Sequence, residues 1–285
     1  MPQKVKIRTP EDTTFCENLA RLYLHYGSVD EALASSPVPL PISPADYHRK
    51  IVEWGIVKAP SKSSSMSDIL TFLSHYVRSS DTISNLYKRM PHTFQPSIQT
   101  VYRVLHNIKE GIVTRSAVAL LITPEDTPSL TLVGNDISVP RADIGKHYGA
   151  ISLPMGFSKQ DEDPVDSIKR VMQREVFMEL TVKHSFPHDV IPQDPKPVMK
   201  LTIADVSVSV YHLVLSQKYI QLLSSEVLQN LRFEAIDTIE DREARLGVCE
   251  ILKGYQKKLL APTNKVYTIP SIINVEIAAR YSEAR

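Results

Sequence analysis

The sequence predicts a multidomain fold, in which an all-α N-terminal part is followed by an α/β/α sandwich in the C-terminal part. Up to residue 111, apolar residues recur at helical spacing and the segments end at Gly or Pro. From Arg115 onward, short runs of β-type sequence alternate with helical patterns. Helices gathered at the front and an α/β pattern behind them indicate separate domains within the 285 residues.

Residues 1–58 are predicted to form three helices. The first has one apolar face made by Phe15, Leu19, Leu22, Tyr23 and Tyr26 and ends at Gly27. A capping box over residues 28–31 starts the second helix, and Ser43-Pro44 starts the third, which Gly55 ends.

This order resembles a homeodomain-like helix-turn-helix, although the connection over residues 35–42 is longer than such motifs favour. In that resemblance the third helix buries Ile51 and Trp54. Its predicted outward residues are Tyr47, His48, Arg49 and Lys50, of which the last three are candidate nucleic-acid contacts. The alternative is a small helical bundle without nucleic-acid contacts.

Residues 59–67 (APSKSSSMS) have no periodicity and are predicted to be a linker. In residues 68–115, two apolar stripes precede a third helix that Pro96-Ser97 opens, with Ile98, Val101, Leu105 and Ile108 on its core face. The run TVYRVL followed by Gly111-Ile-Val resembles the recognition helix of a winged helix-turn-helix and the start of its wing. The resemblance implies nucleic-acid contacts by Ser97, Gln99, Thr100, Arg103 and Lys109. A plain bundle, or a winged helix that binds protein, remains the alternative.

Residues 116–285 are predicted to form the sandwich. Strands are expected at 117–123, 130–134, 151–154, 200–216 (one strand or a hairpin) and 232–239, with helices after Asp163-Pro164 and over 241–260. The segment ISLPMGFSKQDEDPVDSIKRVMQREVFMELTV joins a glycine turn at Gly156 to an acidic helix. Glu175 and Glu179 are four residues apart, so one helix projects both carboxylates from one face.

This segment resembles the Nudix box, and the order of strands and helices resembles the Nudix fold. Without a gap, Gly156, Glu162 and Arg170 match the Gly, Glu and Arg of the motif, but Val171 and Arg174 then stand at glutamate positions. With four residues inserted after the turn, Arg174-Glu175 and Glu179 match instead. The gapped register is preferred here, because it places the apolar residues and the two glutamates on separate stripes.

The resemblance implies roles for these residues. Arg174 is expected to orient the glycine turn through a salt bridge to the upstream glutamate, and Gly156 and Arg174 to contact the ligand. Glu175 and Arg174 are the candidate catalytic residues. Glu175, Glu179 and Glu162 are the candidate ligands of Mg²⁺ or Mn²⁺. Met178 and Thr181 replace a glutamate and the final glycine, so weak metal binding or a degenerate box with solvated charges is expected.

Charge and cysteine content bound the function only broadly. The front is mildly basic, with about 14 Lys and Arg against about 10 Asp and Glu in residues 1–115, which favours a nucleic-acid partner. Two isolated cysteines fit a reducing cytosol, and no signal peptide or membrane span is visible, so a cytoplasmic protein is predicted.

Three functions follow from these features. The preferred one is a DNA-binding transcriptional regulator, expected to be a homodimer, whose Nudix-like domain senses a nucleotide-diphosphate metabolite such as ADP-ribose. Its domain content resembles that of Nudix-related transcriptional regulators, in reverse order. The first alternative is an active hydrolase that cleaves a nucleoside-diphosphate-linked substrate or an RNA 5′ end. The second is a non-catalytic scaffold in a larger assembly.

Overall fold

The computed structural model describes residues 10–58, 69, 72–73, 81–91, 96–110, 115–141, 144, 146–159, 161–203, 205–260 and 266–270. The predicted linker at 59–67 and the residues after the third helix of the second segment, 111–114, lie outside these ranges. Within them, no helix has both the length and the apolar character that crossing a membrane requires.

Three helices form the N-terminal segment, as expected: α1 (Pro10–Tyr26), α2 (Val29–Ser35) and α3 (Pro44–Glu53). Gly27 ends α1 with a φ of 74°, a conformation that glycine adopts readily. Ser28 and Ser43 cap the next two helices, their hydroxyls accepting from the backbone N–H of Glu31 (3.4 Å) and Asp46 (3.1 Å).

The prediction that Tyr47 points outward is wrong. Its ring is fully buried in the core of the three helices, and its hydroxyl donates to the Leu19 carbonyl at 2.6 Å. That hydrogen bond lets a phenol enter the core without an unsatisfied polar atom. Ile51 and Trp54 are buried as expected.

The second segment contains α5 (Ile83–Arg89) and α6 (Ile98–Lys109). Within the described part of the chain, the buried residues of this segment form a hydrophobic cluster of their own. They are Ile69, Leu73, Ile83, Leu86, Met90, Val101, Val104 and Leu105. Ser97 caps α6, its hydroxyl accepting from the Thr100 N–H at 3.2 Å. Arg115 then begins the first strand of the sandwich. The predicted start of the wing, Gly111-Ile-Val, lies outside the described residues.

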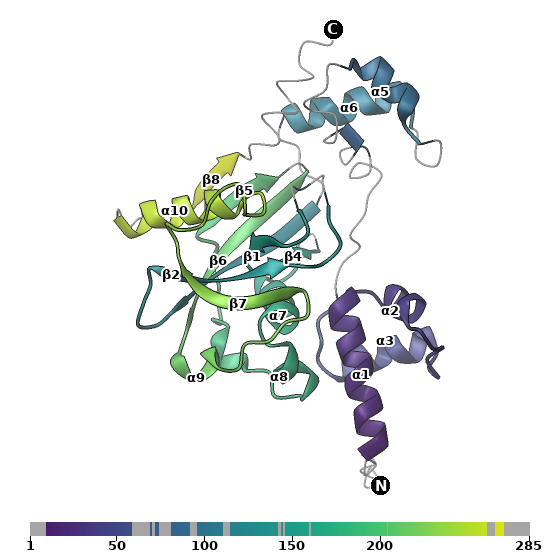
Figure 1. Cartoon of the computed structure of the whole chain (residues 1–285), viewed down its shortest axis with the longest axis vertical. Coiled ribbons are helices and arrows are strands. Elements are labelled where there is room, and N and C mark those ends of the chain that lie inside the picture. Colours follow the sequence, from purple (N-terminus) through teal and green to yellow (C-terminus); the bar gives the residue numbers. More distant parts are fainter. Residues whose placement is uncertain are drawn as a thin grey trace.

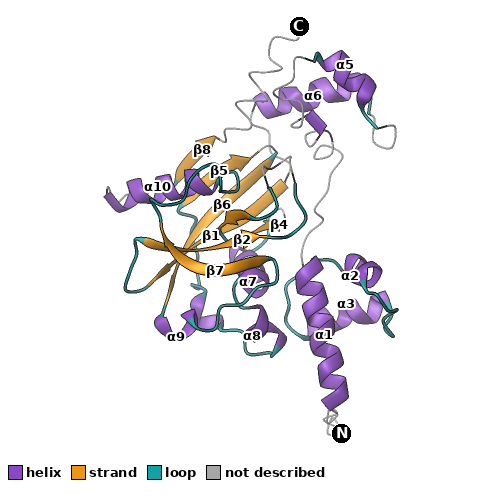
Figure 2. Cartoon of the chain, in the orientation of Figure 1, coloured by secondary structure: helices purple, strands orange, loops and turns teal. Residues whose placement is uncertain are grey.

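The sandwich holds two sheets, which Figure 2 shows among the helices. The strands are β1 (Arg115–Pro124), β2 (Leu130–Asp136), β3 (Ala150–Ser152), β4 (Met155–Ser158), β5 (Met199–Ile203), β6 (Val206–Leu215), β7 (Leu228–Ala235) and β8 (Tyr267–Pro270). Their order is β4-β1-β6-β5-β8 in the larger sheet and β3-β2-β7 in the smaller one. The expected hairpin within 200–216 is β5–β6, and β8 was not predicted.

Alternate residues of β1 serve the two faces of the larger sheet. Ala117, Ala119 and Leu121 pack in the cluster that includes α10 (Val248–Leu260). Val118, Leu120 and Ile122 pack with α7 (Pro164–Glu175) on the opposite face. This alternation, with period two along the strand, produces the α/β/α layering that the sequence predicts.

The N-terminal helices lie beside α7 and α8 (Met178–Val182), as Figure 1 shows. Met178 and Val182 of α8 are part of the apolar core of α1–α3, so the first segment and the sandwich share one core.

The acidic helix is interrupted, against expectation. The helix α7 ends at Glu175 and α8 begins at Met178. Between them the backbone pairs with Ser224, whose N–H donates to the Val176 carbonyl (2.8 Å) and whose carbonyl accepts from the Met178 N–H (3.1 Å). These bonds replace helical ones. Glu175 and Glu179 therefore do not share one face of one helix, and the prediction from their spacing is wrong.

Candidate functional site

A cavity of about 550 Å³ lies between the sandwich and the N-terminal helices. This size is within the range of small-molecule sites. The sandwich supplies the apolar floor and a set of charged side chains, and α1 and α2 supply the opposite wall. The lining residues used below are His25, Tyr26, Glu31, Ser35, Ala117, Asp136, Ser138, Arg141, Ile144, Lys146, Met155, Gly156, Phe157, Arg174, Glu175, Ile203, Val206, Val208 and Arg245.

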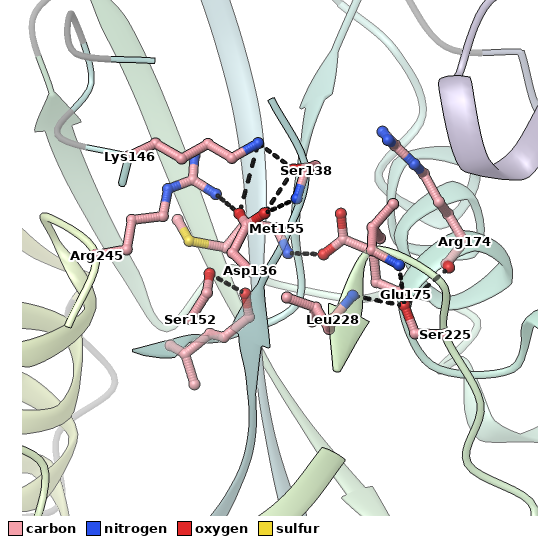
Figure 3. A network of polar contacts seen from close by, with 12 residues as sticks. Asp136, Ser138, Lys146, Ser152, Met155, Arg174, Glu175, Ser225, Leu228 and Arg245 are labelled. Atoms are coloured by element: carbon pink, nitrogen blue, oxygen red, sulfur yellow. Dashed lines mark hydrogen bonds and ion pairs between the residues drawn. The ribbon is translucent and has the colours of Figure 1, made fainter. Parts of the chain in front are cut away.

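A buried carboxylate, Asp136, stands at the end of β2 and organises one side of the cavity (Figure 3). It accepts hydrogen bonds from the N–H (3.0 Å) and hydroxyl (2.5 Å) of Ser138. Lys146 Nζ and Arg245 Nη1 lie 3.5 and 3.6 Å from its Oδ2 atom. Lys146 also donates to the Ser138 hydroxyl. One carboxylate thus holds two cationic side chains at the cavity.

A short loop brings a further cation beside Lys146. The backbones of Arg141 and Lys146 pair directly, N–H to carbonyl in both directions, at 2.8 and 2.9 Å. Like charges in directly opposed positions repel. The Arg141 guanidinium also lies 5.6 Å from the Phe157 ring centroid, with Arg115 at 5.3 Å. The loop therefore concentrates positive charge at the rim, an arrangement that favours an anion.

Glu175 faces the cavity from the last residue of α7. It is 8% exposed, and its Oε2 atom accepts from the Met155 N–H at 2.8 Å. Burial raises the pKa of Glu175 to about 7, against the opposing effect of Arg174. Burial lowers the pKa of Lys146 to about 8, although Asp136 counteracts this. Both groups therefore change charge near neutral pH inside the same cavity.

The glycine turn is tied to α7 by Arg170, and the prediction that Arg174 does this is wrong. Arg170 donates to Glu162 through Nη1–Oε1 at 2.6 Å and Nη2–Oε2 at 2.5 Å. Glu162 Oε2 also accepts from the Lys159 N–H (3.2 Å) and the Ser167 hydroxyl (2.7 Å). This is the pair required by the ungapped register, so the gapped register preferred from the sequence does not describe the structure.

Arg174 turns instead to the end of α1. Its Nε donates to the Leu24 carbonyl at 2.9 Å and its Nη2 to the His25 carbonyl at 3.1 Å. Arg174 and Gly156, the two predicted ligand contacts, both line the cavity. A side chain at Gly156 would press its Cβ to 3.1 Å from Val171, so the turn and α7 pack closely there.

The predicted metal ligands do not converge. Glu162 is engaged by Arg170, Glu175 faces the cavity, and Glu179 pairs with Arg21 through two hydrogen bonds, one of them 2.8 Å long. In the ungapped register, the buried Val171 and the cationic Arg174 occupy the remaining ligand positions. Mg²⁺ and Mn²⁺ require oxygen donors. Within the described residues, no three His, Cys, Asp or Glu side chains group to hold a metal ion, and the residues present do not fit one.

The predicted nucleic-acid contacts fall on two helices with different surroundings. On α3, His48 and Arg49 are exposed, but Arg49 pairs with Asp46 (2.7 Å) and Lys50 with Glu53 (3.1 Å). On α6, Gln99, Tyr102, Arg103 and His106 are exposed along one face, while Ser97 and Thr100 are joined at the helix start (3.0 Å). The side chain of Lys109 lies outside the described part of the chain.

Sequence reasoning missed Asp136, Arg141, Lys146 and Arg245, which dominate the cavity. They are spread over more than a hundred residues of the sequence and match no motif. The signal that was available is local: Asp136 closes an apolar strand, and a polar residue at such a position is often functional.

No family model matches the chain, and no curated protein matches it either. Several solved structures resemble it. A NUDIX hydrolase from Nitrosomonas europaea is 13% identical with a TM-score of 0.39, covering 55% of this chain and 80% of that one. The NUDIX domain of Shewanella oneidensis NrtR, solved with ADP ribose, is 11% identical with a TM-score of 0.36, covering 65% and 97%. A C. elegans Ap4A hydrolase is 13% identical with a TM-score of 0.34, covering 52% and 98%. At these values the likenesses assign no function.

Proposed function

We propose that the protein binds an organic diphosphate of the nucleotide class in the cavity, without hydrolysing it, and acts as a ligand-responsive nucleic-acid-binding regulator. The observation that carries the proposal is the crowding of Arg141, Lys146, Arg174 and Arg245 around one largely apolar cavity. Charge of one sign is concentrated in this way where a ligand of the opposite sign neutralises it.

The charge balance of the cavity supports an anionic ligand. Its four cationic side chains are opposed by Glu31, Asp136 and Glu175. Because the pKa of Glu175 is raised to about 7, that carboxyl is partly neutral at physiological pH. The net charge facing the ligand is therefore positive. A diphosphate carries at least two negative charges and accepts the bidentate hydrogen bonds that arginine offers.

The rest of the cavity supports an organic group attached to the anion. Its floor consists of Ala117, Ile144, Ile203, Val206 and Val208, and Phe157 offers an aromatic face beside Arg141. An inorganic anion alone leaves this surface uncovered. A nucleoside or sugar linked to the diphosphate covers it and gains from burial of its apolar faces.

Binding without hydrolysis is proposed because the side chains do not fit a catalytic cation. Val171 is buried in the core beneath α7, and Arg174 donates to the backbone of α1. Neither can ligate a divalent metal. No metal-dependent step is proposed.

The nucleic-acid surface proposed is α6 rather than α3. The charges of Arg49 and Lys50 are offset by Asp46 and Glu53 on the same helix. The exposed face of α6 has Gln99, Tyr102, Arg103 and His106, which can contact bases and phosphates. A homodimer presenting two such helices would contact paired half-sites.

Calorimetry with ADP-ribose, ADP and pyrophosphate tests the ligand, and electrophoretic mobility shift with duplex DNA tests the regulator. We expect ADP-ribose and ADP to bind more tightly than pyrophosphate, and bound ADP-ribose to alter the affinity for DNA. Absence of binding by all three probes overturns the ligand proposal. Absence of any DNA complex at low salt overturns the regulator.

A further inference from the structure

The cavity is a composite of two parts of the chain. His25 and Tyr26 at the end of α1, and Glu31 and Ser35 on α2, form the wall that faces the sandwich residues. A ligand filling the cavity therefore touches both parts. The complete cavity exists only while α1 and α2 are in place against α7.

One face of α7 holds the N-terminal segment by its backbone. Arg170, Gln173 and Arg174 lie at helical spacing and all contact main-chain atoms of that segment. Gln173 donates to the Gly55 carbonyl (2.9 Å) and accepts from the Val57 N–H (3.0 Å). Arg170 donates to the Lys58 carbonyl at 3.3 Å.

The end of α1 is held in the same way. Its last-turn carbonyls, which no helical N–H can satisfy, accept from Arg174. A cation at a helix C-terminus is favoured by the helix dipole as well. Arg174 also lines the cavity, and the next residue, Glu175, faces into it. One arginine thus contacts both the end of α1 and the space that a ligand occupies.

We propose that Arg174 is a positioning residue that couples the cavity to the N-terminal helices, so that an anionic ligand stabilises the packing of α1 and α2 against α7. This rests on the proposed function. The cations of the empty cavity repel one another, and an anion among them removes that repulsion. The ligand has its full set of contacts only when α1 and α2 are packed against α7. Ligand binding and this packing therefore stabilise each other reciprocally.

Amide hydrogen exchange on the full chain, with and without saturating ADP-ribose, measures how stably α1 and α2 are packed against the rest of the protein. Amides of residues 19–35 are expected to exchange at least about five-fold more slowly with the ligand, since a coupling of 1–3 kcal/mol corresponds to about 5- to 150-fold. In Lys146→Gln, which removes a cation of the cavity, the same ADP-ribose concentration is expected to slow exchange in residues 19–35 less than it does in the wild type. Exchange in residues 199–215 reports whether the sandwich remains folded.

Two sets of variants separate coupling from direct contact. The double variant Arg21→Gln/Gln173→Ala removes contacts between the N-terminal helices and α7–α8 without altering a cavity residue. It is expected to speed amide exchange in residues 19–35 and to lower the affinity for ADP-ribose by several-fold. Arg174→Ala is expected to do both more strongly, and Arg174→Lys to restore part of each. Lys253→Gln, an exposed substitution on α10, is the matched control and is expected to change neither.

A double variant with unchanged exchange, or with faster exchange and unaltered ADP-ribose affinity, overturns the coupling. So does wild-type protein that binds ADP-ribose with no change of exchange in residues 19–35, and in these cases the ligand proposal stands. Failure of ADP-ribose, ADP and pyrophosphate to bind the wild type overturns both proposals together.

Discussion

Arg170 and Glu162 form a buried, doubly hydrogen-bonded ion pair between the middle of α7 and the loop after the glycine turn. Their side chains are only 7% and 8% exposed. The pair fixes the loop against the helix and thereby the position of Gly156 and Met155 in the cavity. Removing one partner leaves the other charge buried without its neutralising group.

We expect Arg170→Met to lower the free energy of unfolding by about 3 kcal/mol, because it leaves the buried Glu162 carboxylate without a positively charged partner. Urea unfolding followed by circular dichroism measures the change. Arg170→Met/Glu162→Leu is expected to lose less than the single variant, since no charge is stranded. A double variant that loses the sum of the two single changes contradicts this account.

The same pair predicts a response to acid. Burial acts to raise the pKa of Glu162, but the hydrogen bonds from Arg170 and Ser167 lower it on balance. A lowered pKa stabilises the fold above the unfolded value of about 4.5, and this stability is lost as the pH falls through the folded pKa. The difference in stability between wild type and Glu162→Gln is therefore expected to shrink in urea titrations below pH 4.5.

Lys146→Gln and Arg245→Gln are each expected to lower the affinity for ADP-ribose by about 10- to 100-fold, as is usual for loss of one charged hydrogen bond in a partly buried site. Isothermal titration calorimetry measures the effect. Lys218→Gln, exposed on α9 (Gln217–Ile220), is the control and should bind as the wild type does. Equal losses in all three variants would point to a non-specific effect of net charge.

Affinity for ADP-ribose is expected to fall as the pH rises from 6.5 to 9. Glu175, with a pKa of about 7, gains negative charge over this range, and Lys146, with a pKa of about 8, loses positive charge. Asp136, Arg174 and Arg245 face the same space, and His25 lies on the wall opposite. In Glu175→Gln the fall near pH 7 should disappear, while the fall near pH 8 should remain. Affinity that rises with pH would contradict the charge assignment.

Glu175 also predicts a change of stability with pH. Its folded pKa is raised above the unfolded value, so the unfolded state ionises first as the pH rises, and stability falls between about 4.5 and 7. The full difference corresponds to about 3 kcal/mol at most, at 1.36 kcal/mol per pKa unit. Glu175→Gln is expected to be more stable than the wild type at pH 8 in urea unfolding. Lower stability at that pH would indicate that the carboxylate is needed as an ionised partner.

Divalent metal ions are expected to change neither the affinity for the ligand nor its chemical integrity. The calorimetric affinity for ADP-ribose should be the same with 5 mM Mg²⁺ as with EDTA, and chromatography after long incubation should recover the ligand intact. The physical reason is the donor set, in which Val171 and Arg174 provide no oxygen. Metal-dependent release of AMP that Glu175→Gln abolishes would establish a hydrolase instead.

On the nucleic-acid side, Arg103→Ala is expected to weaken a duplex DNA complex in mobility-shift titrations, because the side chain is exposed on the open face of α6. Arg49→Ala is the matched control, since its guanidinium is paired with Asp46 on α3. Loss of one phosphate contact also reduces the salt dependence of binding by about one unit of slope. Equal effects of the two substitutions would place the interface elsewhere.

The sequence predicted most of the elements because their signals are local. Serine caps at Ser28 and Ser43, helical apolar stripes and alternating strands each depend on residues a few positions apart. The hairpin β5–β6, which was one of two alternatives for residues 200–216, and the succession of most strands along the chain followed from the same patterns. Tyr47 was misplaced because its polar atom is satisfied by a carbonyl 28 residues away, which no local pattern reveals.

The site was harder to predict because it depends on distant contacts. The register of the box was predicted wrongly, because the gapped alignment places the apolar residues and the two glutamates on separate stripes of an uninterrupted helix. It is decided by the reach of Arg170 to Glu162 and by the pairing of Ser224 with the backbone that separates α7 from α8. The cavity joins residues from α1, β2, α7 and the segment before α10, and only the folded chain brings them together.

The α5–α6 segment is inserted between two anchored points of the chain. Arg170 holds the carbonyl of Lys58 before it, and Arg115, paired with the buried Asp205, begins β1 after it. Five peptide units separate Glu110 from Arg115, a reach of roughly 18 Å, and eleven separate Lys58 from Ile69, roughly 40 Å. The segment is thus tethered at both ends, one of them very short. The end of α6 therefore stays within that short reach of the start of β1, and its proposed DNA-contacting face can move relative to β1 only as far as this connection permits.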